Sequence, residues 1–395
     1  MMRLASLLLI GCLASTGCAA DNMTRGEQLA QDMLIVDTHI DVPYRLENSP
    51  ADISKATASG DFDFPRAEKG GLDVAFMSIY VPAHLPMEKA TPLADKLISQ
   101  VEQVVTRSPD KFAIATSTEE VLEQEEDGLM SFALGMENGE PLAGKIANLR
   151  HFYDRGIRYI TLAHSKSNHI SDSSYDPERR WEGLSPFGQS LIIEMNNIGM
   201  MIDVSHITDK AFWQVMQVSK VPVIASHSSA RKFTPGFERN MSDEMIKALA
   251  ENGGVIQINF GSSFISQDAR LWYDNLNAAR EAYREQTGTA ESDEKMSAFT
   301  AGYMAANPFP FADLDDVLDH IDHVVEIAGV DYVGIGSDYD GVGDTLPVGL
   351  KDVSTYPNLV DGLLERGYSE ADIEKILGGN LMRVWREVEE YARNR

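Results

Sequence analysis

Apolar residues gather in eight short runs along the chain, and most of these runs show no alternation with polar residues. The runs are rich in Val, Ile, Met and Tyr, and they cover residues 34–36, 74–81, 131–136, 157–163, 199–204, 221–225, 254–259 and 332–335. A strand buried on both faces has this composition, because helices cover both faces of a parallel sheet. We therefore predict eight strands of a parallel sheet.

Segments with the periodicity of amphipathic helices separate these runs. The clearest cover residues 94–107, 188–198, 209–218, 243–252 and 314–328, and a short acidic helix is predicted at about 24–33. A glycine, which suits a left-handed helix cap, stands between a helix and the next strand at Gly156, Gly199, Gly253 and Gly329. Repeated alternation of strand and helix predicts an α/β fold, a single-domain (β/α)8 barrel of the TIM type. An open doubly wound sheet fits less well, because no Gly-rich phosphate loop follows the first run.

Two connections are longer than a minimal barrel needs. Residues 47–71 join the first two predicted strands, and residues 262–310 form an acidic, helical and aromatic-rich insertion after the seventh. Both follow the carboxyl end of a strand, where barrel enzymes place the loops that shape the substrate site. The second insertion is also compatible with a solvated helical pair or with a contact between the subunits of a homodimer.

The first residues predict export from the cytoplasm. A short basic start precedes the apolar run 4–14, which is too short to span a bilayer, and small residues follow it. We predict a signal peptide at residues 1–20, of the lipoprotein type with a lipid anchor at Cys18, ahead of a metal-dependent barrel domain at 24–395. The expected location is the periplasm or the cell envelope, and simple secretion is the alternative.

Composition narrows the chemistry further. A formal net charge of −27 over 395 residues argues against binding to nucleic acid and to an anionic membrane surface. The two cysteines, Cys12 and Cys18, both lie in the predicted leader. The domain therefore has no thiol for catalysis or metal binding, so any metal must be held by His, Asp and Glu.

Metal-competent side chains stand at the ends of six of the eight predicted strands. The first strand ends in His39-Ile40-Asp41, whose two polar side chains point to the same face because strand residues alternate. The later strand ends carry Glu137, His164, His206, His227 and Asp338. The chain has only nine histidines, so four at strand ends are improbable by chance. Since barrel enzymes build their sites at these ends, we predict a metal centre there.

The number of these ligands favours two metals over one. A single hydrolytic zinc ion usually takes three protein ligands, and this set is larger. Two ions about 3.5–4 Å apart that share a carboxylate would use the whole set. Glu137 is the natural bridge, which leaves Asp338 for proton transfer and His164 for stabilising an oxyanion.

The order of these motifs resembles that of the membrane (renal-type) dipeptidases, zinc peptidases of the amidohydrolase-like barrel group. The resemblance extends from about Met33 to Val384. It rests on VDTHID, FPRAEKGGLDVAFMSIYV, MENG, TLAHSKSN, LSPFGQ, IDVSH, ASHSSAR, ERNM and VGIGSDYDG. The ordered set is far more specific than any one of these motifs.

The resemblance implies a dipeptidase with two Zn²⁺ ions per chain and a hydroxide held between them, acting on dipeptides that can include L,D-dipeptides. It implies that His39 and Asp41 bind one zinc, that His206 and His227 bind the other, and that Glu137 bridges them. It also implies roles for four further residues: His164 contacts the substrate carbonyl, Asn168 belongs to the substrate-binding loop, Arg239 receives the substrate carboxylate, and Asp338 transfers the proton.

Some features depart from the family or have another interpretation. His169 is unusual in its loop and could crowd the substrate site, while Asp37 and Asp340 are expected to orient ligands or loops. His320 and His323 lie on a predicted amphipathic helix, where a surface role is expected. Two other functions stay open: another binuclear amidohydrolase, such as a lactamase or an N-acyl amino acid hydrolase, and a non-catalytic envelope protein that keeps the site.

Overall fold

The computed structural model describes residues 23–395, and it confirms the predicted TIM-type barrel. The strands are β1 (Ile35–Ile40), β2 (Leu72–Tyr80), β3 (Phe112–Ile114), β4 (Met130–Glu137), β5 (Ile157–Thr161), β6 (Met201–Asp203), β7 (Ile224–Ser228), β8 (Val255–Ile258) and β9 (Val333–Ile335). All of them pair in parallel, and contact between β2 and β4 closes the ring β1-β2-β4-β5-β6-β7-β8-β9. The predicted leader and its lipid anchor at Cys18 lie outside the described residues and stay predictions.

The sequence did not predict β3. This strand has three residues and pairs only with Met130, Ser131 and Phe132 at the start of β4, outside the closed ring. A run this short carries no periodicity that could distinguish it from a loop. The predicted barrel strands all exist, but β6 begins only at Met201 because Gly199 caps α7, and β9 begins only at Val333 because residues 330–332 form a 3-10 turn.

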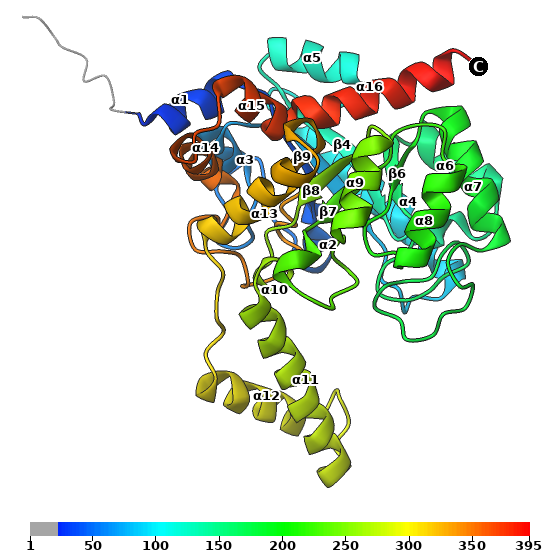
Figure 1. The fold of residues 1–395 in the computed structure, drawn as a ribbon, viewed down its shortest axis with the longest axis vertical. Helices are drawn as coiled ribbons and strands as arrows, with labels where there is room; N and C mark the ends of the chain where they lie inside the picture. The colour runs from blue at the N-terminus through cyan, green and yellow to red at the C-terminus, as the bar shows by residue number, and fades with distance from the viewer. Residues whose placement is uncertain (1–22) are drawn as a thin grey trace, which may run out of the picture.

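Helices surround the ring (Figure 1). They are α1 (Arg25–Asp32), α2 (Val42–Asn48), α3 (Phe64–Gly70), α4 (Met87–Arg107), α5 (Thr118–Glu126), α6 (Ile146–Asp154), α7 (Pro186–Ile198), α8 (Asp209–Val218), α9 (Asp243–Glu251), α10 (Ser262–Ile265), α11 (Gln267–Thr287), α12 (Glu294–Ala306), α13 (Leu314–Ile327), α14 (Tyr356–Glu365), α15 (Glu370–Glu374) and α16 (Asn380–Arg393). The predicted cap at Gly199 is left-handed, with φ of 81°, and it ends α7 where β6 must begin. None of the described helices is long and apolar enough to cross a membrane.

The amino-terminal end of the barrel is closed by α16. Trp385 is fully buried there, and its ring centroid lies 5.3 Å from that of Phe76 inside the barrel. The Phe76 ring in turn lies 5.5 Å from Tyr159, so one apolar cluster joins the inside of the barrel to the closing helix. Because this end is filled with apolar side chains, a polar site can form only at the carboxyl ends of the strands.

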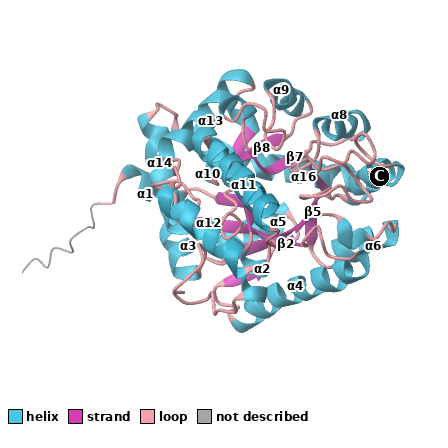
Figure 2. Cartoon of the chain, turned by 90° about the horizontal axis from the view of Figure 1, so that it is seen from below, coloured by secondary structure: helices cyan, strands magenta, loops and turns pink. Residues whose placement is uncertain are grey.

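The predicted insertion after the seventh barrel strand is helical and extends from the barrel as an arm, formed by α11 and α12 (Figure 1). Seen from below in Figure 2, the arm overlies the strands. Aromatic residues hold its two helices together: Tyr283 stacks on Phe299 at 4.4 Å, and the Trp272 indole donates to the Asn307 carbonyl at 2.8 Å. The homodimer stays a prediction.

The expected surface role of His320 and His323 is wrong, because both side chains are buried. His320 accepts the backbone N–H of Ala230 at Nδ1, over 3.0 Å, and donates from Nε2 to the Ile265 carbonyl, over 3.1 Å. His323 contacts Asp243 at 2.8 Å. Helix α13 packs against both α9 and the barrel, so more of its circumference is buried than its amphipathic pattern indicates.

The burial of His320 predicts that the folded protein becomes less stable as the pH falls. Burial lowers the pKa of His320 to about 3, whereas an unfolded histidine titrates near 6.5. Between these values the unfolded chain binds a proton that the folded chain does not, so the free energy of unfolding falls as the pH drops. The contribution of His320 is at most about 1.4 kcal/mol per pH unit. In urea unfolding between pH 6.5 and 4, His320→Gln should show a shallower pH dependence than the unsubstituted protein.

The control for this measurement is the exposed His84, replaced in the same way. His84→Gln should change the pH dependence of the unfolding free energy less than His320→Gln does. Equal slopes for the unsubstituted protein and His320→Gln would contradict the assignment of His320 as a buried neutral histidine.

Candidate metal centre and active site

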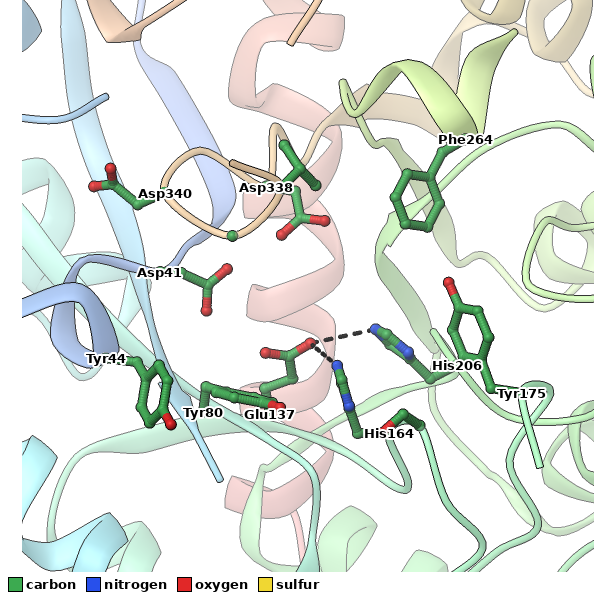
Figure 3. Close-up of a pocket in the computed structure, with 13 residues that line it drawn as sticks. Asp41, Tyr44, Tyr80, Glu137, His164, Tyr175, His206, Phe264, Asp338 and Asp340 are labelled. Atoms are coloured by element: carbon green, nitrogen blue, oxygen red, sulfur yellow. Dashed lines mark ion pairs between the residues drawn. The ribbon is translucent and has the colours of Figure 1, made fainter. Parts of the chain in front are cut away.

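The polar side chains at the strand ends surround a cavity of about 390 Å³ (Figure 3). Its walls are Asp41, Tyr44, Tyr80, Glu137, His164, Ser165, Tyr175, His206, Phe264, Asp338, Asp340, Gly341 and Val342. These residues come from the ends of β1, β2, β4 and β5 and from the loops after the later strands. A cavity of this volume is within the range of small-molecule sites.

Glu137 lies at the centre of the cluster, and its two carboxylate oxygens face different partners. Oε2 lies 3.5 Å from His39 Nε2. Oε1 lies 3.4 Å from His164 Nε2, 3.3 Å from His206 Nε2 and 3.4 Å from His227 Nε2. Figure 3 draws the contacts to His164 and His206. A carboxylate with one oxygen toward each of two groups of ligands has the arrangement that a bridge between two metals requires.

The tautomer of His39 follows from its neighbours. The Tyr159 hydroxyl donates to the Thr38 carbonyl at 3.0 Å, so it must accept the bond of 2.8 Å from His39 Nδ1–H. In the neutral ring Nε2 then carries a lone pair, and it faces Asp41 Oδ2 at 3.4 Å as well as Glu137. Nε2 is buried without a hydrogen-bond partner in the described chain. This lone pair and the carboxylate oxygens repel each other unless a cation lies between them.

His227 is oriented in the same manner. The Ser226 hydroxyl donates to Asp203 at 2.7 Å, and it therefore accepts the bond of 2.7 Å from His227 Nδ1–H. His227 Nε2 is left as a lone pair, 2.8 Å from His206 Nε2. Partners of this kind fix the tautomer of metal-binding histidines in other proteins. The donor set of histidine nitrogens and carboxylates thus fits metal ions such as zinc.

At His206, His227 and Glu137 the electrostatics favour the protonation states that bind metal. Burial lowers the pKa of His227 to about 3 and that of His206 well below its ordinary value. Burial alone would raise the pKa of Glu137, but the charges of His39 and His164 hold it well below the usual range. Neutral His206 and His227 beside an ionised Glu137 are the forms that coordinate a cation. Burial would lower the pKa of His39, but Tyr159, Glu137 and Asp41 raise it well above its ordinary value, so His39 must lose a proton when a metal binds.

Asp338 is held beside the candidate metal ligands by its backbone and by one amide. It has φ of 64°, an unusual value for a residue other than glycine, and its N–H donates to the His39 carbonyl at 3.0 Å. The Asn259 side chain donates to Asp338 Oδ2 at 2.7 Å. Burial raises the pKa of this carboxyl. A Cβ at Gly341 would collide with the carboxylates of Asp338 and Asp41, so a larger residue there would displace both side chains.

Arg239 lies beside the cavity and is 3% exposed. Its guanidinium donates to Ser228 Oγ at 2.7 Å and to the His227 carbonyl at 2.6 Å, which ties it to the end of β7. Its Nε is buried without a partner in the described part of the chain. The Phe264 ring lies 5.4 Å from the guanidinium carbon, so Arg239 is next to the cavity wall.

Asn168 is not among the residues that line the cavity, and its substrate-binding role stays a prediction. Its amide donates to Asn138 and to the Leu162 carbonyl, at 3.1 and 2.8 Å, and its oxygen accepts the N–H groups of Ile170 and Ser171. All of its hydrogen-bonding groups are therefore used to order the loop. His169, which we expected could crowd the site, contacts Glu140 instead and is also absent from the cavity wall.

Asp37 and Asp340 orient loops, as expected. Asp37 accepts the backbone N–H groups of His39 and Ser337, at 3.0 and 3.1 Å. The carboxylate of Asp340 accepts the Asp61 N–H at 2.6 Å and lies 3.1 Å from Arg45 Nε, and Figure 3 shows it pointing away from Glu137.

The sequence did not indicate the aromatic walls, Tyr44, Tyr80, Tyr175 and Phe264. Only Tyr80, the last residue of β2, stands at a strand end and could have been found by the reasoning that found the ligands. Asn259 follows β8 directly and could have been found in the same way.

Comparison with known proteins places the chain among hydrolases. The family model of the membrane dipeptidases, peptidase family M19, matches residues 23–395. Dipeptidase aclJ of Aspergillus oryzae is 33% identical over 343 residues, which are 85% of this chain and 72% of that protein. An uncharacterized dipeptidase of Schizosaccharomyces pombe is 31% identical, over 92% of this chain and 83% of its own length. The crystal structure of the probable dipeptidase PvdM from Pseudomonas aeruginosa superposes with a TM-score of 0.82 at 28% identity, covering 93% of this chain and 98% of that chain.

Proposed function

Because the chain belongs to the membrane dipeptidase family, peptidase family M19, and is a metallopeptidase that cleaves peptide bonds, we propose that it hydrolyses dipeptides at a centre of two zinc ions. The observation that carries this proposal is the position of Glu137 between two groups of ligands. His39 and Asp41 would hold one zinc and His206 and His227 the other, with Glu137 shared. When bound, the two ions supply Lewis acidity toward the scissile carbonyl and the attacking water.

The remaining groups at the cavity would carry out the proton transfers and the substrate contacts. His164 can donate to the oxygen of the scissile carbonyl, because its Nε2 faces the cluster at Glu137. Asp338 takes the proton of the attacking water and delivers it to the leaving amine. Its buried position supports this exchange, since a carboxyl with a raised pKa can both accept and donate a proton.

Arg239 would bind the free carboxylate of the dipeptide, which limits cleavage to short substrates. The unpartnered Nε and the position beside Phe264 support this role. A carboxylate anchor alone does not determine the configuration of the second residue, so dipeptides with a D-residue at the second position belong to the proposed substrate class.

The test is hydrolysis of L,L- and L,D-dipeptides by the metal-reconstituted protein, with each dipeptide compared to its C-terminal amide. We expect kcat/KM to be higher for the free acid, and Arg239→Ala to remove this discrimination while lowering kcat/KM for the acid. Removing the partner of a buried charge costs about 2–4 kcal/mol, which corresponds to a roughly 30- to 1,000-fold decrease in kcat/KM.

Lys232→Ala is the matched control, because Lys232 is a cation of the same loop but is exposed and contacts His323 at 3.1 Å. It should keep the discrimination between acid and amide. Turnover of dipeptides with no effect of Arg239→Ala would favour another amidohydrolase of the same fold, such as a lactamase. Two bound metals without turnover of any dipeptide would contradict the proposed function.

A further inference from the structure

Tyr44 and Tyr80 form a rigid aromatic wall on one side of the cavity (Figure 3). Their rings meet edge to face, with centroids 4.9 Å apart and an interplanar angle of 90°. The Tyr80 ring also contacts the His164 ring, at 4.9 Å and 62°. Both tyrosines are half-buried, so the contacts with their neighbours hold the rings in place while one face stays open to the cavity.

This wall lies opposite Arg239 across the mouth of the barrel. Tyr80 ends β2, and Arg239 is bound to His227 and Ser228 of β7. In the ring of eight strands, β2 and β7 are four positions apart, which puts them on opposite sides of the closed barrel. A dipeptide whose carboxylate is bound at Arg239 therefore extends across the centre at Glu137 toward the two tyrosines.

The side chain of the first residue would lie at this wall. The scissile carbonyl belongs to that residue, and it must lie next to His164 and Glu137 for the proposed reaction. The side chain is carried by the α-carbon next to this carbonyl, on the side away from Arg239. The Tyr80 ring is in direct contact with His164, so it borders that position.

Resting on the proposed function, we propose that Tyr44 and Tyr80 form the subsite for the first side chain and select dipeptides whose first residue is large and apolar. The two aromatic faces offer apolar contact area, which favours an apolar side chain over a charged one. Differences of one or two carbon groups in such a pocket change kcat/KM by about 10- to 200-fold.

The test is a series of dipeptides with a constant second residue, Phe-Ala, Leu-Ala, Ala-Ala and Gly-Ala, on the metal-reconstituted protein. We expect kcat/KM for Phe-Ala and Leu-Ala to exceed that for Gly-Ala by about tenfold or more. Tyr44→Ala should reduce this ratio, and Tyr44→Trp, which narrows the subsite, should shift the preference toward Gly-Ala and Ala-Ala. The two variants are expected to change the ratio of kcat/KM values in different ways, so the result still holds if one of them fails to fold.

Tyr175→Ala is the matched control, since Tyr175 lines the cavity near His206, with ring centroids 5.9 Å apart, on the side of Arg239. It should leave the ratio between Phe-Ala and Gly-Ala unchanged. Turnover with equal kcat/KM for all four dipeptides, or a ratio that both Tyr44 variants leave unchanged, would overturn this inference alone. No turnover of any dipeptide would overturn the proposed function and this inference with it.

Discussion

Glu137→Gln is expected to lower the metal content of the protein and to reduce dipeptide hydrolysis by about a thousandfold or more. The substitution keeps the size of the side chain but removes the charge that faces His39 on one side and His206 and His227 on the other. Bound metals contribute several kcal/mol to the stabilisation of the transition state, which corresponds to a loss of this size. Metal analysis of the purified variant and kcat/KM for a dipeptide measure the two effects separately.

Ser78→Ala is the control for this experiment. The Ser78 hydroxyl donates to Glu137 Oε2 at 3.2 Å, but it is not a member of the ligand set. We expect this variant to keep its metals, with a metal affinity reduced by about tenfold to a hundredfold at most. If Glu137→Gln bound as much metal as the unsubstituted protein, Glu137 could not be the shared ligand.

Asp338→Asn is expected to lower kcat by about 100- to 10,000-fold, the range of general acid–base catalysis, with little change in KM. The amide keeps the shape of the side chain but cannot accept a proton from water and deliver it to the leaving amine. The metal content should not change, because the ligand set around Glu137 is intact. Steady-state kinetics with one dipeptide and metal analysis of the same sample test both expectations.

Asp340→Asn separates proton transfer from loop geometry. Asp340 is two residues away, but its carboxylate contacts Arg45 and the Asp61 N–H instead of pointing toward Glu137. A smaller loss of kcat is expected for this variant than for Asp338→Asn. If both variants lost the same activity, Asp338 would act by holding its loop, and the assignment of proton transfer to it would be wrong.

The fold was predictable because a parallel barrel repeats one local pattern. Each buried strand is an apolar run and each helix an amphipathic segment, so periodicity found every barrel strand. The three residues of β3 were missed because they form no run of their own. His320 was misplaced because an amphipathic pattern shows that one face is buried but does not show how many neighbours cover the helix.

The set of metal-binding candidates was also predictable, because the carboxyl ends of the strands in a barrel converge at one face. His39, Glu137 and His227 are far apart in the chain, yet each lies near the carboxyl end of a strand of the same ring and they meet within one cluster. Asn168 shows the limit of this reasoning. A motif places a residue in a loop, but the loop's own hydrogen bonds decide whether the side chain is available to a substrate.

By itself, the sequence determined the barrel, the order of the ligands and the absence of thiols from the domain, since these depend on local periodicity and residue identity. The tertiary structure alone decided which nitrogen of His39 carries the proton, because Tyr159, 120 residues away, sets that tautomer. It also decided which Glu137 oxygen faces which histidine and that Tyr44 and Tyr80 stand opposite Arg239. These properties arise only when the ring closes and brings distant side chains within contact distance.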